Sequence, residues 1–449
     1  MSGVRRLRRA LLLAAGMWCA IAAAAAATER PNIVFLFADD LRADAIAALG
    51  NPDVKTPHLD SLVRAGRVFT NAYCLGANMP AVCTPSRNTL LSGQSYFRWR
   101  GPLAPADRFN LPRALNERGY ATYHHGKRGN TATAIQALFE VNKYVDDDRD
   151  RNSGEPGREI VDQAIETLRS RDESRPFCMY LAFSNPHDPR VAAPAYRELY
   201  RPDELSLPAN FLPLHPFDNG ELEIRDERLA PWPRTADEIR RQLHDYYAVI
   251  SGLDHHLGRL LATLDELGMR ENTVIVFSAD HGLALGSHGL MGKQSLYDHS
   301  MKAPLVFAGP GIVAGKSDAL VYLHDICPTL CELAGAALPE RLDGQSLAPL
   351  LRGEQAPTRP TLFLAYRDVQ RAVRDQRFKL IRYPQVDVTQ LFDLANDPHE
   401  LHNLASDPAY GGQVLELRRA LSSWQESLGD NTPWVAEKLH SPVWTPPSR

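Results

Sequence analysis

The sequence predicts an α/β protein built around a largely parallel sheet, and three observations support this fold class. Apolar runs bounded by turn residues alternate with amphipathic stretches, as strands alternate with helices in such proteins. Four of the five apolar runs lead directly into polar, potentially reactive residues. The chain has 449 residues, 44% apolar and 23% charged, which is enough to bury a sizeable core. Because ligands bind beyond the carboxyl ends of parallel strands, we expect the four polar segments to share one site.

The individual elements follow from these runs. Strands buried on both faces should read as continuous apolar stretches, and such stretches occupy residues 32–38, 120–124, 177–183, 273–278 and 305–307. Apolar residues at helical spacing predict helices over residues 58–65, 112–118, 159–169, 236–267 and 325–334. The proline-rich region 186–233 has little periodicity, so we expect a long surface excursion that shapes a substrate site.

The pattern changes after residue 355. Short strands are predicted at 361–366, 370–374 and 377–382, with the last two joined as a hairpin at Asp375-Gln376. A helix over residues 412–429 would cover them. We therefore divide the chain into a catalytic domain, 28–355, and a smaller C-terminal subdomain with an antiparallel sheet and a helix, 356–449.

The first 27 residues have the pattern of a signal peptide. Four arginines, at positions 5, 6, 8 and 9, precede an uncharged, alanine-rich run from residue 10 to residue 27. A retained membrane anchor is the alternative, because 18 uncharged residues are nearly enough to span a bilayer. The alanines favour cleavage, which predicts an exported protein, periplasmic or secreted, with no transmembrane segment. Without these four arginines, 46 basic residues face 54 acidic ones, a net charge of −8 that argues against nucleic acid as a partner.

The cysteine count argues against a disulfide scaffold. One of the six cysteines lies in the signal segment, and the five others are Cys74, Cys83, Cys178, Cys327 and Cys331. An odd, sparse set does not make a disulfide framework, so at least one thiol must be unpaired or have another use. The last two lie one helical turn apart and are expected to pack as small apolar residues. Cys83 is the candidate for another use.

Cys83 begins the segment Cys83-Thr84-Pro85-Ser86-Arg87, which continues to Ser92-Gly93. This segment resembles the sulfatases, whose C-x-P-S-R motif is read by a modifying enzyme. In that family the cysteine is oxidised to formylglycine, and its hydrated aldehyde supplies the nucleophile. The resemblance implies formylglycine at Cys83, an Arg87 that orients it, and a formylglycine-generating or sulfatase-maturing enzyme as a partner. A buried cysteine at a helix start is the alternative for a motif this short.

Two strand ends carry candidate metal ligands. Asp39-Asp40 follows the first strand, and adjacent carboxylates repel each other unless a cation lies between them. Oxygen ligands suit a hard divalent ion. The resemblance places metal ligands here and at Asp280-His281, with Cys83 completing the set, and implies one divalent cation, calcium with magnesium as the alternative. A solvated turn is the alternative for an isolated Asp-Asp pair.

Two further segments match residues that contact sulfate in the family. Lys293, in the run that leads to Tyr297-Asp298, matches a lysine that grips the sulfate, and the Tyr-Asp pair should open the following helix. Lys302 stands where an arginine is commoner. His187, in Asn185-Pro186-His187-Asp188-Pro189, matches a histidine that contacts sulfate and can assist the leaving group. Any one of these residues could instead be a solvated loop residue.

The main departure from the family pattern follows Lys127. This lysine matches the one that stabilises formylglycine, but the histidine expected two or three residues later is absent, because Gly129 and Asn130 stand there. In the family that histidine is the base that releases sulfate. Side chains alternate along a strand, so either His124 or His125 could face the site and replace it. Otherwise the enzyme would be slow or repurposed.

The resemblance extends in order from residue 32 to residue 404, including the segment 391–398 near the C-terminus. It implies an alkaline-phosphatase-like fold, a mixed and mostly parallel sheet between helices with a smaller C-terminal α+β subdomain. It also implies a type I, formylglycine-dependent sulfatase, a sulfuric ester hydrolase. The stretch 280–289 resembles the iduronate-sulfatase branch, which favours a sulfated sugar as substrate over a small aryl sulfate. The alternatives are a phosphodiesterase or phosphonate monoester hydrolase at the same site, and a non-catalytic binder of sulfated glycan.

Overall fold

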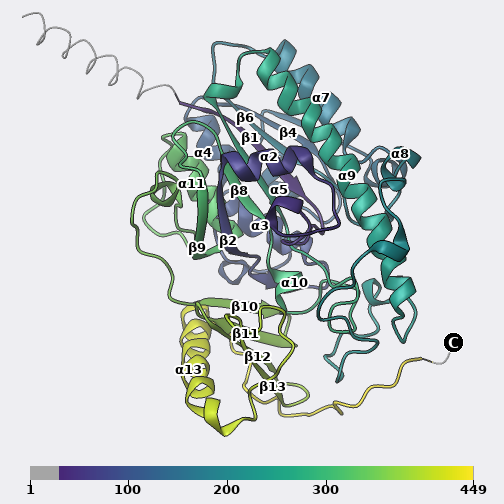
Figure 1. Ribbon diagram of the computed structural model, residues 1–449. Helices are drawn as coiled ribbons and strands as arrows, with labels where there is room; N and C mark the ends of the chain where they lie inside the picture. The colour runs from purple at the N-terminus through teal and green to yellow at the C-terminus, as the bar shows by residue number, and fades with distance from the viewer. Residues whose placement is uncertain (1–29, 448–449) are drawn as a thin grey trace, which may run out of the picture.

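The computed structural model describes residues 30–447, and two sheets organise it (Figure 1). The expected signal peptide, residues 1–27, lies outside the described residues. The larger sheet has eight strands in the order β5-β4-β6-β1-β7-β8-β2-β9. In chain order these strands are β1 (Asn32–Ala38), β2 (Arg67–Tyr73), β4 (Ala121–Gly126), β5 (Val141–Tyr144), β6 (Phe177–Ala182), β7 (Thr273–Ala279), β8 (Leu305–Ala308) and β9 (Gly315–Tyr322).

The sheet is mixed and mostly parallel, as the sequence predicts. Strand β8 runs antiparallel to its neighbours β7 and β2, whereas the other neighbouring pairs are parallel. All seven residues of β1 are buried between β6 and β7, which explains their continuous apolar sequence. The five predicted strands correspond to β1, β4, β6, β7 and β8. Strands β2, β5 and β9 were not predicted.

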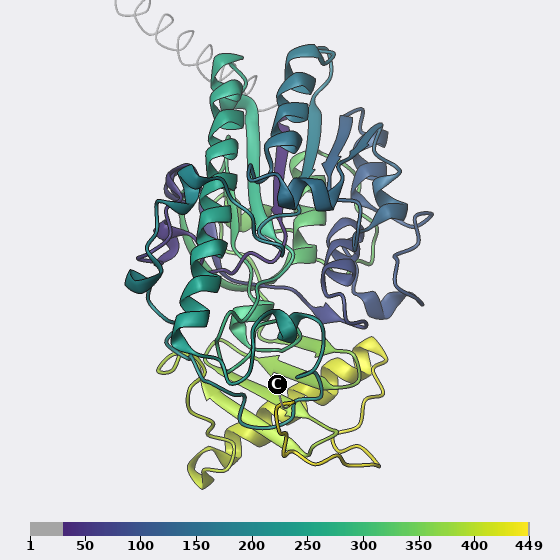
Figure 2. The same ribbon diagram turned by 90° about the vertical axis from the view of Figure 1, so that its right-hand side faces the viewer.

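Helices cover both faces of this sheet (Figure 2). Helices α2 (Pro57–Ala65), α7 (Arg158–Ser170) and α9 (Ala236–Glu266) pack together as one group, and α3 (Cys83–Ser92), α4 (Leu111–Glu117) and α11 (Ile326–Leu333) form the other. The shorter helices are α5 (Thr133–Gln136), α6 (Asp147–Asn152), α8 (Pro194–Arg197), α10 (Asp298–Met301) and α12 (Ala348–Leu351). The five predicted helices correspond to α2, α4, α7, α9 and α11. The region 186–233 is largely irregular, with α8 and two short 3-10 turns, as its composition predicts.

The smaller sheet has five strands in the order β13-β12-β11-β10-β3. Four of them come from the C-terminal region: β10 (Leu362–Tyr366), β11 (Gln370–Arg374), β12 (Phe378–Tyr383) and β13 (Val388–Asp393), with α13 (Gly411–Leu428) packed on β11 and β12. The fifth, β3 (Gly76–Ala77), precedes α3 and pairs in parallel with β10. Gly76 is required there, because its φ is +107° and a Cβ atom would lie 1.9 Å from the Ala365 carbonyl oxygen.

A buried group of charged residues joins the two sheets, and we call it the interface cluster: Tyr73, Asp298, Arg374, Lys379 and Glu400. The Lys379 ammonium lies 2.8 Å from Asp298 Oδ1 and 2.7 Å from Glu400 Oε1. The Tyr73 hydroxyl donates to the same Asp298 carboxylate at 2.8 Å, and Arg374 donates to that hydroxyl. Asp298 opens α10, as the sequence predicts, and its backbone N–H donates to Glu400 Oε2 at 2.7 Å.

Two further predictions concern cysteines and membrane spans. Cys74, Cys83, Cys178, Cys327 and Cys331 are all free and buried, in agreement with the expected lack of a disulfide scaffold. Among the helices of residues 30–447, none is both long and apolar enough to cross a membrane.

Candidate active site

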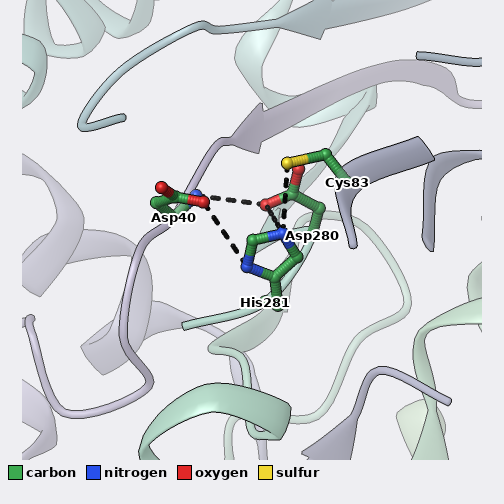
Figure 3. Close-up of side chains that lie close together, drawn as sticks. All are labelled: Asp40, Cys83, Asp280 and His281. Atoms are coloured by element: carbon green, nitrogen blue, oxygen red, sulfur yellow. Dashed lines mark hydrogen bonds and ion pairs between the residues drawn. The ribbon is translucent and has the colours of Figure 1, made fainter. Parts of the chain in front are cut away.

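The polar segments that follow β1, β4, β6 and β7 meet around Cys83, the first residue of α3. Figure 3 shows the residues that follow β1 and β7, which are Asp40, Asp280 and His281, beside Cys83. This convergence follows from the topology, because β4, β6, β1 and β7 are adjacent parallel strands and their carboxyl ends lie at the same edge. All ten residues of α3 are buried, and its N-terminus brings the thiol to that edge. We call the group formed by Asp39, Asp40, Cys83, Arg87, Lys127, Asp280, His281 and Lys293 the Cys83 cluster.

Four residues of the cluster are arranged as metal ligands. The nearest ligand atoms of Asp40, Cys83, Asp280 and His281 all lie within 4.8 Å of one another. His281 Nε2 is 3.2 Å from the Cys83 sulfur, and the Asp40 backbone N–H donates to Asp280 Oδ1 at 3.1 Å. Asp40 has a left-handed φ of +63°, an uncommon conformation for aspartate that is often retained at functional sites. Carboxylate oxygens with an imidazole nitrogen suit a divalent cation, so these residues fit the metal that the sequence implies.

Arg87 and Lys127 form ion pairs with the carboxylates of Asp39 and Asp280. Asp39 Oδ1 lies 3.3 Å from the Cys83 sulfur, while its Oδ2 accepts hydrogen bonds from Lys127 and, at 3.0 Å, from Arg87. Arg87 also donates to Asp280 Oδ2 at 3.0 Å, so one guanidinium fixes two carboxylates. Burial alone would raise the pKa of Asp39, but the charges of Lys127 and Arg87 hold that pKa well below its ordinary value.

Lys293 lies beside both Asp40 and the thiol. Its ammonium lies 2.7 Å from Asp40 Oδ1 and 3.5 Å from the Cys83 sulfur. Burial alone would lower the pKa of Lys293, but the Asp40 carboxylate raises it well above its ordinary value. Burial likewise opposes ionisation of Asp40, yet Lys293 lowers the pKa of this carboxyl to about 2. Burial and the Asp39 carboxylate together raise the pKa of the Cys83 thiol, which disfavours a thiolate.

The charges of the cluster balance before any ion is added. Three buried carboxylates, those of Asp39, Asp40 and Asp280, face three buried cations, which are Arg87, Lys127 and Lys293. A divalent cation would leave two positive charges in excess at a site that water reaches poorly. Electrostatic interactions are strong in such surroundings. The metal-bound site would therefore bind an anion.

A cavity of about 180 Å³ opens onto the Cys83 cluster. Cys83, Lys293 and His187 line it, and we call it the catalytic pocket. His187 Nδ1 lies 2.7 Å from the Asp188 carbonyl oxygen, so Nδ1 carries the proton of the neutral ring and Nε2 is the acceptor. Burial and the neighbouring Lys293 ammonium lower the pKa of His187 to about 3.

His124 and His125 lie outside the catalytic pocket. His124 packs on the rings of Tyr144 and Tyr180, with Nδ1 2.7 Å from Asn142 Oδ1. His125 points to the opposite face of the sheet, where its Nε2 is 3.3 Å from the Thr167 hydroxyl on α7. Neither is among the residues that line the pocket. This corrects the expectation that one of them faces the site. The two side chains lie on opposite faces of β4, and each has a partner in the protein core.

Asn130, Asp226 and Gln294 are among the pocket residues that were not identified from the sequence. Asn130 lines the pocket three residues after Lys127, one of the two places where the family histidine was expected. Asp226 and Gln294 join through a 2.8 Å hydrogen bond, and Asp226 Oδ2 lies 3.9 Å from the Lys293 ammonium. Asp226 comes from the irregular region 186–233, for which the sequence predicted only a surface excursion that shapes the substrate site.

Comparisons with known proteins match most of the chain. The family model described as Sulfatase matches residues 31–336, and the model described as N-sulphoglucosamine sulphohydrolase, C-terminal, matches residues 286–427. An N-acetylglucosamine-6-O-sulfatase of Bacteroides thetaiotaomicron is 26% identical, over 90% of this chain and 88% of the relative. An ulvan-active sulfatase of Formosa agariphila is 28% identical, over 89% of this chain and 82% of the relative.

Solved structures show the same fold. One, described as a complex with its substrate D-glucosamine-2-N,6-O-disulfate, has a TM-score of 0.79 and 25% identity, and the match covers 91% of this chain and all of the other. The phosphonate monoester hydrolase of Agrobacterium radiobacter has a TM-score of 0.75 and 23% identity, over 89% of this chain and 96% of the other. The second likeness concerns the fold alone.

Proposed function

The chain belongs to the sulfatase family, and from this premise we propose that it hydrolyses sulfate esters of carbohydrates with a formylglycine formed from Cys83 as nucleophile. As a type I sulfatase of the alkaline phosphatase superfamily it is a sulfuric ester hydrolase. The observation that carries the proposal is the position of Cys83, which lies between balanced buried charges and lines the catalytic pocket.

The metal and the modified residue supply the chemistry that ordinary side chains lack. Asp39, Asp40, Asp280 and His281, with residue 83, would hold one divalent cation, calcium or magnesium. When bound, the cation would polarise the sulfate oxygens and neutralise charge that develops on them. Formylglycine, when formed, would offer a hydroxyl of its hydrated aldehyde as the nucleophile.

The charged side chains bind and orient. The Lys293 ammonium, 3.5 Å from the Cys83 sulfur, is placed to pair with an oxygen of the ester. Lys127 shares the Asp39 carboxylate with Arg87. Because Arg87 is bonded to both Asp39 and Asp280, it keeps the two carboxylates in place while substrate and product exchange.

His187 moves the proton. A negatively charged ester in the pocket would raise the pKa of this imidazole from its low value, since an anion favours the protonated ring. The protonated Nε2 can then donate to the departing alcohol. Once neutral, the same atom can accept the proton that must leave residue 83 before sulfate is released. Asn130 cannot act as this base, because an amide has no basic nitrogen at neutral pH.

The substrate class rests on the relatives. The N-acetylglucosamine-6-O-sulfatase, the ulvan-active sulfatase and the protein bound to D-glucosamine-2-N,6-O-disulfate are all described as acting on sulfated carbohydrates or binding one. The positive excess of the metal-bound site also favours an anionic ester. The iduronate-sulfatase branch stays a prediction. Export by the N-terminal segment is part of the proposal, and N-terminal sequencing of the mature protein would test it.

The decisive experiment combines mass and turnover. A peptide that contains residue 83 should be about 18 Da lighter than the unmodified sequence, the difference between a cysteine and formylglycine. The same preparation should release sulfate from sulfated glucosamine saccharides, and a Cys83→Ala preparation should not. An unmodified thiol in protein that nevertheless turns over the ester would contradict the mechanism.

The alternative chemistry is tested on the same preparation. Structures of phosphonate monoester hydrolases share the fold, so a phosphodiester and a phosphonate monoester should be assayed beside the sulfate ester. We expect the highest kcat/KM for the sulfate ester, and a large preference for a phosphorus ester would overturn the proposal. Binding of sulfated glycan without turnover by protein shown to carry formylglycine and metal would favour the non-catalytic binder.

A further inference from the structure

A second cavity lies beside the catalytic pocket. It has a volume of about 300 Å³ and is bounded by the loop 218–223, the smaller sheet and the C-terminal segment. Glu223 lines this cavity, and the next residue, Ile224, lines the catalytic pocket. Consecutive Cα atoms are about 3.8 Å apart, so the linings of the two cavities meet along the chain at Glu223-Ile224. In Figure 2 the yellow C-terminal segment crosses in front of the green strands of the smaller sheet.

The C-terminal segment forms a wall of this cavity and is held by backbone hydrogen bonds. The Pro442 carbonyl accepts from the Asp218 N–H at 2.7 Å, and the His440 N–H donates to the Gln385 carbonyl at 2.8 Å. Trp444 packs edge-on against Trp232, with ring centroids 5.6 Å apart. These contacts join the tail to the loop whose next residues, 224–226, line the catalytic pocket. The second cavity is therefore built from fixed elements.

The lining has the chemistry of a sugar site. The Trp444 indole offers an apolar ring, and its Nε1 donates to Glu223 Oε1 at 3.3 Å. Around it lie the amides of Asn219 and Gln385, which can donate hydrogen bonds to hydroxyl groups or accept them, and the carboxylate of Asp218, which accepts them. An aromatic surface with a few oriented polar groups suits the apolar face and the hydroxyl edge of a pyranose.

The charge of the lining separates this cavity from the catalytic pocket. The residues that line this cavity, all between positions 218 and 444, include no lysine or arginine, whereas Asp218 and Glu223 contribute carboxylates. A sulfate group placed here would face these two carboxylates with no lysine or arginine to pair with and only the His440 imidazole as a basic group, which is unfavourable. The cavity therefore selects a sugar unit that carries no sulfate.

We propose that this second cavity is a carbohydrate subsite that binds an unsulfated sugar unit joined to the sulfated unit held at Cys83. The proposal rests on the proposed function, because it assumes that a sulfated carbohydrate occupies the catalytic pocket. It names the substrate more closely, as an oligosaccharide in which an unsulfated unit adjoins the unit that loses sulfate.

The first test compares two substrates in the metal-loaded, modified enzyme. A sulfated monosaccharide and the corresponding disaccharide with an unsulfated neighbour are assayed with wild type, Trp444→Ala and Val443→Ala. Val443 is the matched control, because it adjoins Trp444 in the tail and is 76% exposed. Trp444→Ala should lower kcat/KM for the disaccharide roughly fivefold to tenfold and leave the monosaccharide unchanged. An equal loss on both substrates, or no loss on either, would overturn the subsite.

A second variant covers the case in which Trp444→Ala does not fold. Glu223→Gln keeps the shape of the wall and removes a negative charge. Wild type should have a higher kcat/KM for a disaccharide with an unsulfated neighbour than for one sulfated on both units. Glu223→Gln should reduce the ratio of these two kcat/KM values roughly threefold. A wild-type preference for the doubly sulfated disaccharide would contradict the proposal.

A binding measurement separates this proposal from the proposed function. Calorimetric titration of Cys83→Ala protein with the unsulfated disaccharide measures the subsite without catalysis. Binding that Trp444→Ala abolishes, in a protein whose wild type releases no sulfate from any glycan, would sink the proposed function and leave a sugar site. Sulfate release from the monosaccharide, together with no binding and no gain from the second sugar unit, would sink the subsite alone.

Discussion

The Cys83 cluster and the interface cluster are both buried groups of opposite charges, yet only the Cys83 cluster brings several potential metal ligands together around a thiol. A cavity of about 260 Å³ borders the interface cluster at Asp298 and Glu400, just as the catalytic pocket borders Cys83. Burial, charge and a nearby cavity therefore do not identify the active site. Among residues 30–447, groups of three or more ligand atoms within 4.8 Å of one another occur only in the Cys83 cluster and at His187. The convergence of these ligand atoms on Cys83, the proposed nucleophile, is what distinguishes the candidate active site.

The first prediction removes the feature that distinguishes the two clusters. Cys83→Ala should lower sulfate release by about 10⁴-fold or more, because no other group replaces the nucleophile. Its thermal midpoint should stay close to that of wild type, because the mutation removes only the polar group at residue 83 and leaves every ion pair in place. Activity should be measured by sulfate release and folding by circular dichroism.

Cys331→Ala is the control for this change, since it removes another buried thiol, on α11. It should lower the thermal midpoint slightly and keep wild-type kcat. Comparable loss of activity in both variants would contradict a special role for Cys83.

The second prediction replaces one buried lysine in each cluster by methionine. Lys293→Met should lower kcat/KM about 100- to 1000-fold, because the ammonium beside the thiol stabilises the transition state. Lys379→Met should cost about 3–5 kcal/mol of unfolding free energy, since it removes the cation that Asp298 and Glu400 share and leaves Asp298 with the Lys302 ammonium at 3.9 Å. Urea unfolding and steady-state kinetics on the metal-loaded protein measure both. The comparison fails if Lys379→Met lowers kcat of the folded enzyme as much as Lys293→Met does.

The third prediction contrasts a pocket histidine with a core histidine. His187→Asn should lower kcat about 100-fold, since its imidazole carries the proton. His125→Gln should leave kcat within about threefold of wild type and lower the thermal midpoint, because the ring packs beside α7. If His125→Gln were the more damaging to kcat, the assignment of the base would be wrong.

The fourth and smallest effect is a difference in pH dependence. Burial and the nearby Asp298 raise the pKa of Glu400 to about 7, above about 4.3 in the unfolded chain, so the folded state binds the proton more tightly. The stability that this gives is complete below about pH 4 and is lost as the pH rises to about 7. The lowered pKa of Asp40 has the opposite sign, and its contribution is lost as the pH falls from about 4 to about 2.

Glu400→Gln tests that sign. Wild type should lose roughly 1–3 kcal/mol more than Glu400→Gln between pH 5 and pH 7.5, measured by urea unfolding at both values. The same change in both proteins would show that Glu400 does not titrate in this range.

The sequence predicted the parts of the fold that have a strong local pattern. The strand over 32–38 was readable because it is apolar throughout, and Asp39-Asp40 was placed correctly beside the other strand ends by the geometry of parallel sheets. Strand β5 has four polar or half-buried residues, and β9 begins with four that are largely exposed, so neither has a clear apolar run. Strand pairing in the sheet, rather than local composition, makes them strands.

The same limit applies to the site. Asp226 reaches Lys293 through a loop whose path depends on the whole fold, and no spacing in the sequence connects the two residues. Alternation along β4 correctly put His124 and His125 on opposite faces, but it could not show that both faces are filled there by Tyr180 and α7. Motifs at strand ends were predictable, whereas the residues that complete the pocket depended on tertiary packing.

The short strand β3 has a consequence for the order of events during synthesis. Its partner β10 begins 285 residues after Ala77, so the chain beside Cys83 cannot reach its final arrangement until the C-terminal region has been made. At about 5–20 residues per second, this takes roughly 15–60 s. In the finished fold the Cys83 side chain is 1% exposed, out of reach of another protein. An enzyme that modified this thiol would therefore have to meet it before the fold closes around residue 83.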